Sequence, residues 1–204
     1  MQSRPSCDEQ LIRLAIRSMA ENGFAEAMRE AILSLPQDLK AMLRVMEDPD
    51  LDDQGRVLAS GALLHVLSAS NAIPGVKGTL ALVDDVLVLR LALERIAQTS
   101  PEVVTHHRED EPEIFEPWTV QLDAARAYLG DRGVAVLQKA VDGLPKITFQ
   151  GHSARECARD QDAATWLYDS VHEAIIQQFE IAPDEVARAV KNAHEILAKV
   201  SQRA

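Results

Sequence analysis

Apolar side chains recur at intervals of three and four residues along most of the chain, which is the spacing of amphipathic helices. The first such stretch covers residues 11–32 and is interrupted by an Asn-Gly pair, so it predicts two helices or one broken helix. Ser34-Leu-Pro-Gln37 has the pattern of a capping box with proline in the first turn. It predicts a further helix that ends before Pro49.

Two strongly apolar helices are predicted next, over about residues 53–68 and 79–98, with a loop rich in glycine and proline between them. A helix that is apolar on nearly all sides is buried in a protein core or in a membrane. Asp84, Asp85 and Arg90 lie in the second helix, and each would cost roughly 2.5–3.5 kcal/mol at the centre of a bilayer. We therefore expect a hairpin buried in the protein, and not one inserted in a membrane.

The second half of the chain begins with a change of composition. Residues 99–116 contain internal prolines and a run of charge, which predicts a linker or exposed loop. Two helical stripes follow, divided at Gly130, and residues 147–149 form an isolated strand-like segment with no evident partner. Ser153 begins a capping box that predicts a long helix, and Pro183 begins the last helix.

The fold class that follows is all-α, a bundle of about eight or nine helices around the central apolar hairpin. Aromatic residues make up only 4% of the chain, which suits closely packed helices better than strands. Residues 1–98 are predicted to form a helical domain that contains the hairpin. Residues 117–204 form a C-terminal helical region, either separate or packed on the first as one domain.

Within residues 58–96, the positions Ser68, Ile73, Pro74, Val83, Asp84, Asp85 and the apolar run 86–93 follow one another at a characteristic spacing. At these positions the segment resembles the signature of the YkvA-like family, a helical hairpin family of unknown function, over about a fifth of the chain. The family's turn carries acids and prolines where this chain has Ala69, Asn71, Gly75 and Gly78. The resemblance implies a helical hairpin and no particular reaction, and a site built from all of the family's acids would be incomplete here.

Asp85 is the position at which the polar pattern of the hairpin fails. A helical wheel over residues 82–98 gathers one polar arc, consisting of Asp84, Arg90, Glu94, Arg95 and Gln98. Asp85 instead lies in line with Leu89 and Ile96, so a straight helix points its carboxylate at the core. A buried carboxylate without a partner is costly, and Asp85 therefore needs hydrogen-bond donors or a proton.

Two partners for Asp85 are compatible with the sequence. The first is the loop, through the backbone N–H groups of residues 73–78 or the side chains of Ser68 and Asn71, which would fix the turn. The second is His65 on the preceding helix, because an Asp–His pair can orient an imidazole for proton transfer or help to hold a metal. The candidate site therefore consists of Asp85, His65, Asp84, Ser68 and Asn71.

Charge and cysteine content narrow the function classes. The chain has 32 acidic and 21 basic side chains and a net charge of -11, which disfavours nucleic acid and anionic membrane surfaces. Cys7 and Cys157 lie far apart in the sequence, so a disulfide framework is not expected. The amino-terminal segment lacks the apolar core of a signal peptide, and a cytoplasmic protein is expected.

Other residues that can carry chemistry form incomplete patterns. Asp169 and His172 lie on one helical face, but a di-metal bundle needs a second such motif. His106 and His107 lie in a run of charge that is typical of a solvated loop. Cys157 follows a helix start, where a thiol pKa can fall, yet no base stands beside it in the sequence. No catalytic residue, cofactor or complete metal site is predicted.

The leading hypothesis is therefore a non-enzymatic helical module that binds another protein or a second copy of itself. The alternative is a small enzyme or a ligand- or metal-binding protein with a pocket at the hairpin, near Asp85 and His65. This alternative requires a cavity beside the two side chains. Peripheral contact of the apolar hairpin with a membrane is a third hypothesis.

Overall fold

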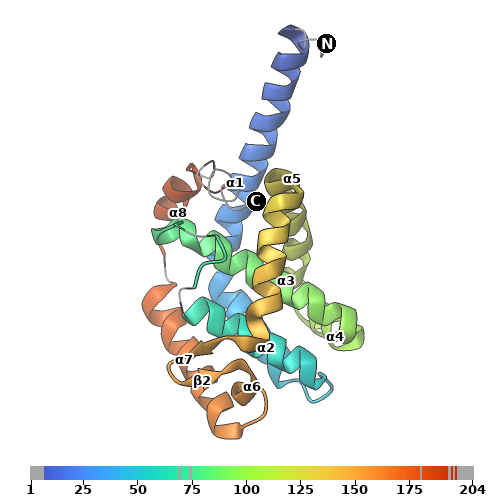
Figure 1. Cartoon of the computed structure of the whole chain (residues 1–204), viewed down its shortest axis with the longest axis vertical. Coiled ribbons are helices and arrows are strands. Elements are labelled where there is room, and N and C mark those ends of the chain that lie inside the picture. The colour runs from blue at the N-terminus through green and yellow to red at the C-terminus, as the bar shows by residue number, and fades with distance from the viewer. Residues whose placement is uncertain are drawn as a thin grey trace.

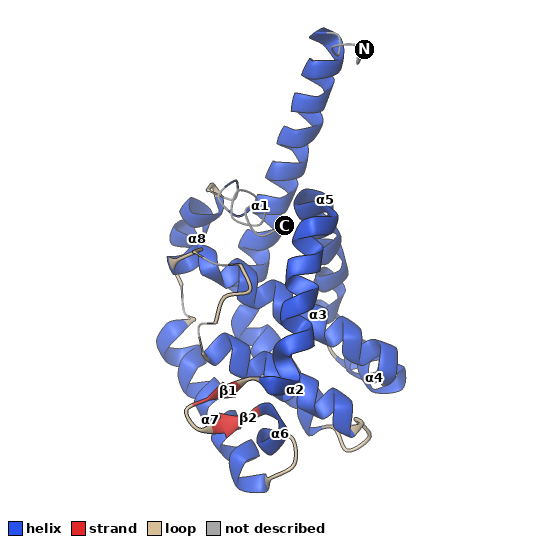
Figure 2. Cartoon of the chain, in the orientation of Figure 1, coloured by secondary structure: helices blue, strands red, loops and turns tan. Residues whose placement is uncertain are grey.

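The computed structural model describes residues 7–68, 70–73, 75–179 and 181–192 together with 194 and 196, with side chains from Met19 onward. Within these residues it confirms the all-α prediction, with eight α-helices and one short pair of strands (Figure 2). The helices are α1 (Cys7–Glu47), α2 (Asp53–Leu67), α3 (Leu82–Thr99), α4 (Pro101–Asp110), α5 (Pro112–Gly143), α6 (Ala154–Cys157), α7 (Gln161–Gln178) and α8 (Pro183–Val190). The short 3-10 helices η1 (Gly78–Ala81) and η2 (Leu144–Lys146) precede α3 and follow α5.

Helix α1 is continuous over 41 residues, so the predicted breaks near Asn22-Gly23 and Ser34 are wrong. Pro36 lies inside the helix, and Ser34 does not cap a new one, because its hydroxyl donates to the carbonyl oxygen of Ala31 at 3.0 Å. Apolar positions continue at helical spacing through the proline, and their burial outweighs the local capping signal. The first turns of α1 extend beyond the bundle (Figure 1).

Helices α2 and α3 form the predicted apolar hairpin at the centre of the bundle. Helix α3 packs against α1, α2, α4 and α5, and most of its side chains are buried. Asp52 caps α2 by accepting a hydrogen bond from the Gly55 N–H at 2.6 Å. The backbone of α2 lies directly against η2, and a Cβ built at Gly61 would stand 2.4 Å from the carbonyl oxygen of Leu144.

Residues 99–116 are helical except at Ser100 and Glu111, so the predicted linker or exposed loop is wrong. They form α4 and the start of α5, and Val103, Val104 and Phe115 enter the core. Arg44 of α1 pairs with Glu111 at the junction between the two helices. The prediction gave weight to the charged residues and overlooked the apolar residues that recur among them at helical spacing. These apolar residues anchor the segment to the bundle.

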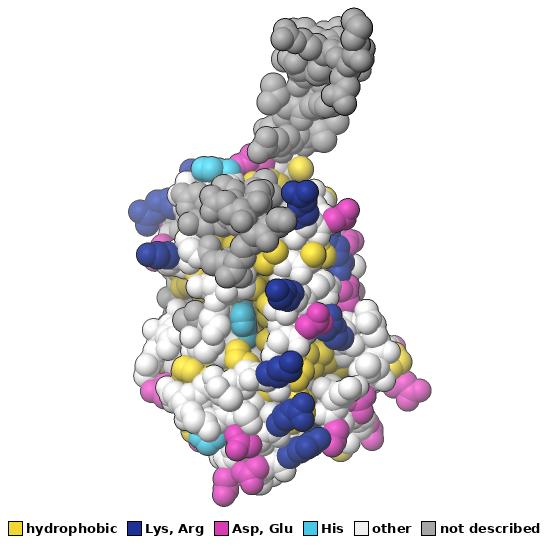
Figure 3. Space-filling view, viewed as in Figure 1, with side chains coloured by type: hydrophobic (Ala, Val, Ile, Leu, Met, Phe, Trp, Pro, Cys, Tyr) yellow, Lys and Arg dark blue, Asp and Glu magenta, His cyan; other side chains and the backbone are white. Residues whose placement is uncertain are grey.

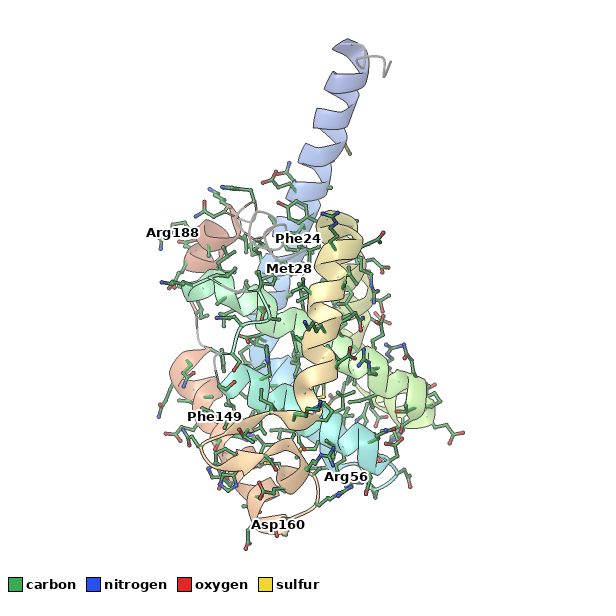
Figure 4. The ribbon with its side chains drawn as sticks, viewed as in Figure 1. Phe24, Met28, Arg56, Phe149, Asp160 and Arg188 are labelled. Atoms are coloured by element: carbon green, nitrogen blue, oxygen red, sulfur yellow. The ribbon has the colours of Figure 1, made fainter. Side chains whose placement is uncertain are left out.

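The two halves of the chain share one hydrophobic core. Helix α5 packs against both α1 and α3, so the described parts of residues 1–98 and 117–204 form one unit. Phe24 and Met28 of α1 are buried and lie at the side of α1 that faces α5 (Figure 4). The Phe24 ring stacks on the Tyr128 ring with centroids 4.4 Å apart.

The element boundaries in the carboxyl-terminal half agree with the prediction, with two differences. Helix α5 breaks at Gly130, which has φ 64° and ψ 179°, as predicted. The segment Thr148–Phe149 does have a partner, because it forms the strand β1 and pairs antiparallel with the strand β2, His152–Ser153. Ser153 and Glu156 form the predicted capping box, but it opens the short helix α6, and α7 has its own N-cap at Asp160.

Helix α8 begins at Pro183 as predicted, with Val186 and Val190 buried. The later stripe positions of that prediction, which are Ala193, Leu197 and Val200, lie outside the described residues. None of the described helices combines the length and the apolar character that crossing a membrane requires.

Candidate functional site

His65, Asp84 and Asp85 meet where α2 ends and α3 begins. His65 lies in the last turn of α2, and the two carboxylates lie in the first turn of α3. Their exposed fractions are 5%, 1% and 4%, so all three polar side chains are enclosed by the protein. Each offers one ligand atom, and these three atoms all lie within 4.8 Å of one another.

Asp84 holds the loop between the two helices. Its Oδ2 accepts a hydrogen bond from the Ala72 N–H at 2.7 Å, and its Oδ1 accepts one from the Ile73 N–H at 2.9 Å. The same Oδ2 lies 3.3 Å from Nε2 of His65. The predicted loop clamp therefore exists, but Asp84 provides it in place of Asp85. Asp84 is buried, and its placement on the solvent-facing arc is wrong, because the loop folds over this side of α3.

Asp85 faces the core as predicted, but the expected hydrogen bonds from the loop are not formed. Its Oδ1 is buried, has no hydrogen-bond partner among the described residues, and lies 3.9 Å from Nε2 of His65. Burial raises the pKa of the Asp85 carboxyl well above its usual range, and the neighbouring charge of Asp84 raises it further. This carboxyl group therefore requires a proton or a bound cation.

Ser68 and Asn71 lie nearby without contacting the carboxylates. Ser68 ends α2, where its hydroxyl donates to the His65 carbonyl oxygen at 2.9 Å. Asn71 is exposed and lines a pocket beside His65. Within the described part of the loop, neither side chain has a hydrogen bond to Asp84 or Asp85. Pro74, which matches the family signature, and Ala69, where the chain departs from it, lie outside the described residues.

The pocket beside His65 has a volume of about 460 Å³. His65 and Asn71 form one side of it, and α5 and η2 form the other, with Lys139, Gly143 and Lys146 among the lining residues. Sequence reasoning missed the contribution of α5 and η2, because their lining residues lie more than seventy positions after His65 in the chain. A cavity is thus present at the hairpin and His65 lines it, but Asp85, which was predicted to line it as well, is not among its lining residues.

A second buried polar cluster lies apart from this site, further along α3. Arg90 is 1% exposed, so its placement on the solvent-facing arc is wrong. Its guanidinium donates to Asp38 Oδ2 from Nε at 3.2 Å and from Nη2 at 2.8 Å, and it also donates to Gln121. Trp118 completes the cluster by donating to the other Asp38 oxygen at 3.3 Å. This network is fully occupied by protein groups and offers no place for a ligand.

Two other histidines considered from the sequence, His107 and His172, also have partners within the protein. His172 Nδ1 lies 2.9 Å from the carbonyl oxygen of Tyr168, one turn earlier in α7, and Asp169 beside it is exposed. His107 lies on a helix, and its Nε2 is 3.0 Å from Asp48 Oδ2. Neither belongs to a group of metal-ligand atoms of the kind found at His65.

The arrangement at His65 places one imidazole nitrogen and two carboxylates around a common point, which is a ligand set that divalent metals accept. No family model matches the chain, and neither the curated proteins nor the solved structures contain a match. The resemblance to the YkvA-like family stays a prediction. Function is therefore argued from the geometry of this site.

Proposed function

We propose that the protein binds a divalent first-row transition metal ion, of the type of Zn²⁺ or Mn²⁺, through His65, Asp84 and Asp85. The observation that supports the proposal is the buried Oδ1 of Asp85, which has no hydrogen-bond donor in the described structure. A buried carboxylate without a partner is expensive, and a bound cation removes that cost. A neighbouring imidazole nitrogen and a second carboxylate supply the rest of the coordination sphere.

The distances suit a small ion. Ligand atoms that surround a tetrahedral Zn²⁺ at about 2.1 Å lie about 3.4 Å from one another. His65 Nε2 is 3.3 Å from Asp84 Oδ2 and 3.9 Å from Asp85 Oδ1. Two of the three ligand pairs thus lie within about half an ångström of that separation, and small side-chain rotations would close the site around the ion.

The surroundings of the ligands also support a metal. Metal-bound carboxylates are usually held by further hydrogen bonds, and Asp84 is held by the N–H groups of Ala72 and Ile73. Three protein ligands leave a coordination position for water or a ligand, as in catalytic zinc sites. An imidazole in the set favours Zn²⁺ or Mn²⁺ over Mg²⁺, which prefers oxygen ligands and retains its water.

Thermal unfolding in the presence of ZnCl₂, MnCl₂ or MgCl₂ tests the proposal. A ligand at a hundred times its Kd stabilises the fold by about 2.7 kcal/mol, which corresponds to roughly 5–10 °C in Tm for a chain of this size. We expect Zn²⁺ or Mn²⁺ to give such a shift and Mg²⁺ to give a smaller one. Isothermal titration should show one ion per chain.

Variants locate the ion. Asp85→Asn and His65→Gln each remove one ligand and should abolish the Zn²⁺ or Mn²⁺ shift. Asp169→Asn is the matched control, because this exposed aspartate also lies near a histidine but belongs to no ligand group. A shift of equal size in the Asp85→Asn protein would overturn the proposal.

Self-association is a second candidate function, favoured by the first turns of α1, which project beyond the bundle (Figure 1). Val120 of α5 and Ile176 of α7 add large apolar side chains that are 70% and 71% exposed. Light scattering over a hundredfold range of protein concentration tests this candidate. A molecular mass that stays at 22.4 kDa throughout would contradict it.

A further inference from the structure

The pocket beside His65 has an apolar interior and a basic edge. Val136, Lys139, Ala140 and Gly143 share one face of α5, because they are spaced three and four residues apart. This face and η2 form one wall, and the end of α2 with the following loop forms the other. The volume of about 460 Å³ falls within the range of small-molecule sites.

Lys139 and Lys146 are both exposed, and neither has an acidic partner among the described residues. Two arginines that belong to α5 or contact it differ from these lysines, since Arg126 pairs with Glu94 and Arg95 pairs with Asp142. Figure 3 shows Lys and Arg side chains in a row down the face on which α5 lies, with apolar surface between them. The chain carries a net charge of -11, so this free positive charge is a local exception.

We propose that the pocket binds a small organic anion with an apolar body, of the class of short-chain carboxylates, with its charged end at Lys139 and Lys146. The apolar body would lie against Val136, Ala140 and Ile147, which line the interior. This inference deepens the metal-binding function and rests on it, because His65 belongs both to the metal ligands and to the wall of the pocket.

The charges near the pocket explain why a bound metal ion should strengthen anion binding. Without an ion, Asp84 places negative charge behind His65, and the carboxyl ends of α2 and α5 each add roughly half a negative charge. These contributions largely cancel the two lysines. A divalent ion neutralises the two carboxylates, and the lysines then leave the pocket positive. Anion binding should therefore be stronger in the metal-loaded protein than in the metal-free protein.

Hexanoate and its uncharged counterpart 1-hexanol are suitable probes. Each is titrated by calorimetry into protein saturated with Zn²⁺, or with Mn²⁺ if that ion gives the larger thermal shift, and into protein from which metal has been removed by dialysis. We expect the loaded protein to bind hexanoate more tightly than 1-hexanol, and to bind hexanoate several-fold more tightly than the metal-free protein does. Equal affinity for the acid and the alcohol would overturn the inference.

Variants separate charge from shape. The double variant Lys139→Met/Lys146→Met should weaken hexanoate binding by about 3- to 10-fold and leave 1-hexanol unchanged, as the loss of two exposed charge contacts implies. Lys77→Met is the matched control, since Lys77 is an exposed lysine beside a different pocket. Gly143→Phe should weaken both probes, because a Cβ at Gly143 meets open space and its backbone has ordinary helical angles.

The experiments distinguish failure of the metal-binding proposal from failure of the pocket proposal. Absence of any thermal shift with Zn²⁺ and Mn²⁺ would overturn the metal site and the coupling that rests on it. Hexanoate binding that does not depend on the two lysines, in a protein that does take up the ion, would overturn the pocket inference alone. The lysine variants should keep the full metal-induced shift in Tm, because neither lysine is a metal ligand.

Discussion

Arg90 Nη2 of α3 lies 2.8 Å from Asp38 Oδ2 of α1, and the two residues are 52 positions apart in the sequence. Both side chains are fully enclosed, and burial raises the pKa of Asp38 although the charge of Arg90 lowers it. A buried ion pair gains little over an apolar pair of the same size, but removing one partner leaves the other charge unpaired. The pair therefore makes the central packing sensitive to single substitutions.

Asp38→Ala should lower the free energy of unfolding by about 3–5 kcal/mol, because it leaves the Arg90 guanidinium buried without its counter-ion. The double variant Asp38→Leu/Arg90→Met should recover most of that loss. Urea denaturation followed by circular dichroism measures both. A loss below about 1 kcal/mol for Asp38→Ala would contradict this account.

Asp85→Asn should stabilise the metal-free protein by about 1–3 kcal/mol at pH 7. The pKa of Asp85 is raised in the fold by burial and by Asp84, so the folded protein holds this proton more tightly than the unfolded chain does. Stability therefore falls as pH rises from the ordinary value of 3.8, and the gain from the variant should shrink as pH is lowered toward 4. Thermal melts from pH 4 to 8 give the comparison, and saturating Zn²⁺ or Mn²⁺ should reverse the order of the two proteins.

Asp84→Asn should destabilise the metal-free protein, whereas Asp85→Asn should stabilise it. The amide can accept one of the two backbone hydrogen bonds but not both, and each hydrogen bond to a charged group contributes roughly 1.5–3 kcal/mol. Hydrogen exchange should show faster exchange of the Ala72 and Ile73 amides in this variant. Unchanged protection of both amides would show that Asp84 does not hold the loop.

Two glycines should respond differently to alanine. Gly61→Ala brings a Cβ within 2.4 Å of the Leu144 carbonyl oxygen, which is backbone and cannot rotate away, and it should cost about 1–3 kcal/mol. Gly143→Ala meets open space at helical angles and should stabilise the protein by about 0.4–1 kcal/mol. Denaturant titrations of the two variants test the close contact between α2 and η2.

The Cys157 thiol should be inert in the native protein. It is 1% exposed, and burial, with the nearby charge of Glu156, raises its pKa to about 11. At pH 8 only about one thiol in a thousand is ionised at this pKa, so iodoacetamide should label Cys157 more than a hundredfold more slowly than in denatured protein. Peptide mass spectrometry separates this residue from Cys7. Because the thiol holds its proton more tightly when folded, stability should decline as pH rises from 9 toward 11.

Periodicity within one helix was enough to predict the hairpin and the inward direction of Asp85. Both depend only on which positions share a face, and a helix of known register determines this. Local backbone preferences predicted the break at Gly130 and the start of the last helix at Pro183. These features required no knowledge of the rest of the chain.

The residues whose surroundings were predicted wrongly have partners that are distant in the sequence or lie on another element. A helical wheel assigns Asp84 and Arg90 to solvent because they are charged, but the loop covers one and α1 covers the other. Ser34 has a capping pattern, yet the packing of α1 keeps the helix continuous through Pro36. The sequence could not place Lys139 and Lys146 in one pocket with His65, because their positions depend on how α5 and η2 cross α2.

The absence of a side chain at Gly61 has a consequence for recognition. It lets η2 rest on the backbone of α2, so the wall that carries Lys146 is fixed by main chain and not by adjustable rotamers. A pocket built in this way is preorganised, so the protein loses little conformational entropy when a ligand binds. Selectivity would then depend on the size and shape of the ligand, because a rigid pocket does not adjust to a ligand that fits poorly.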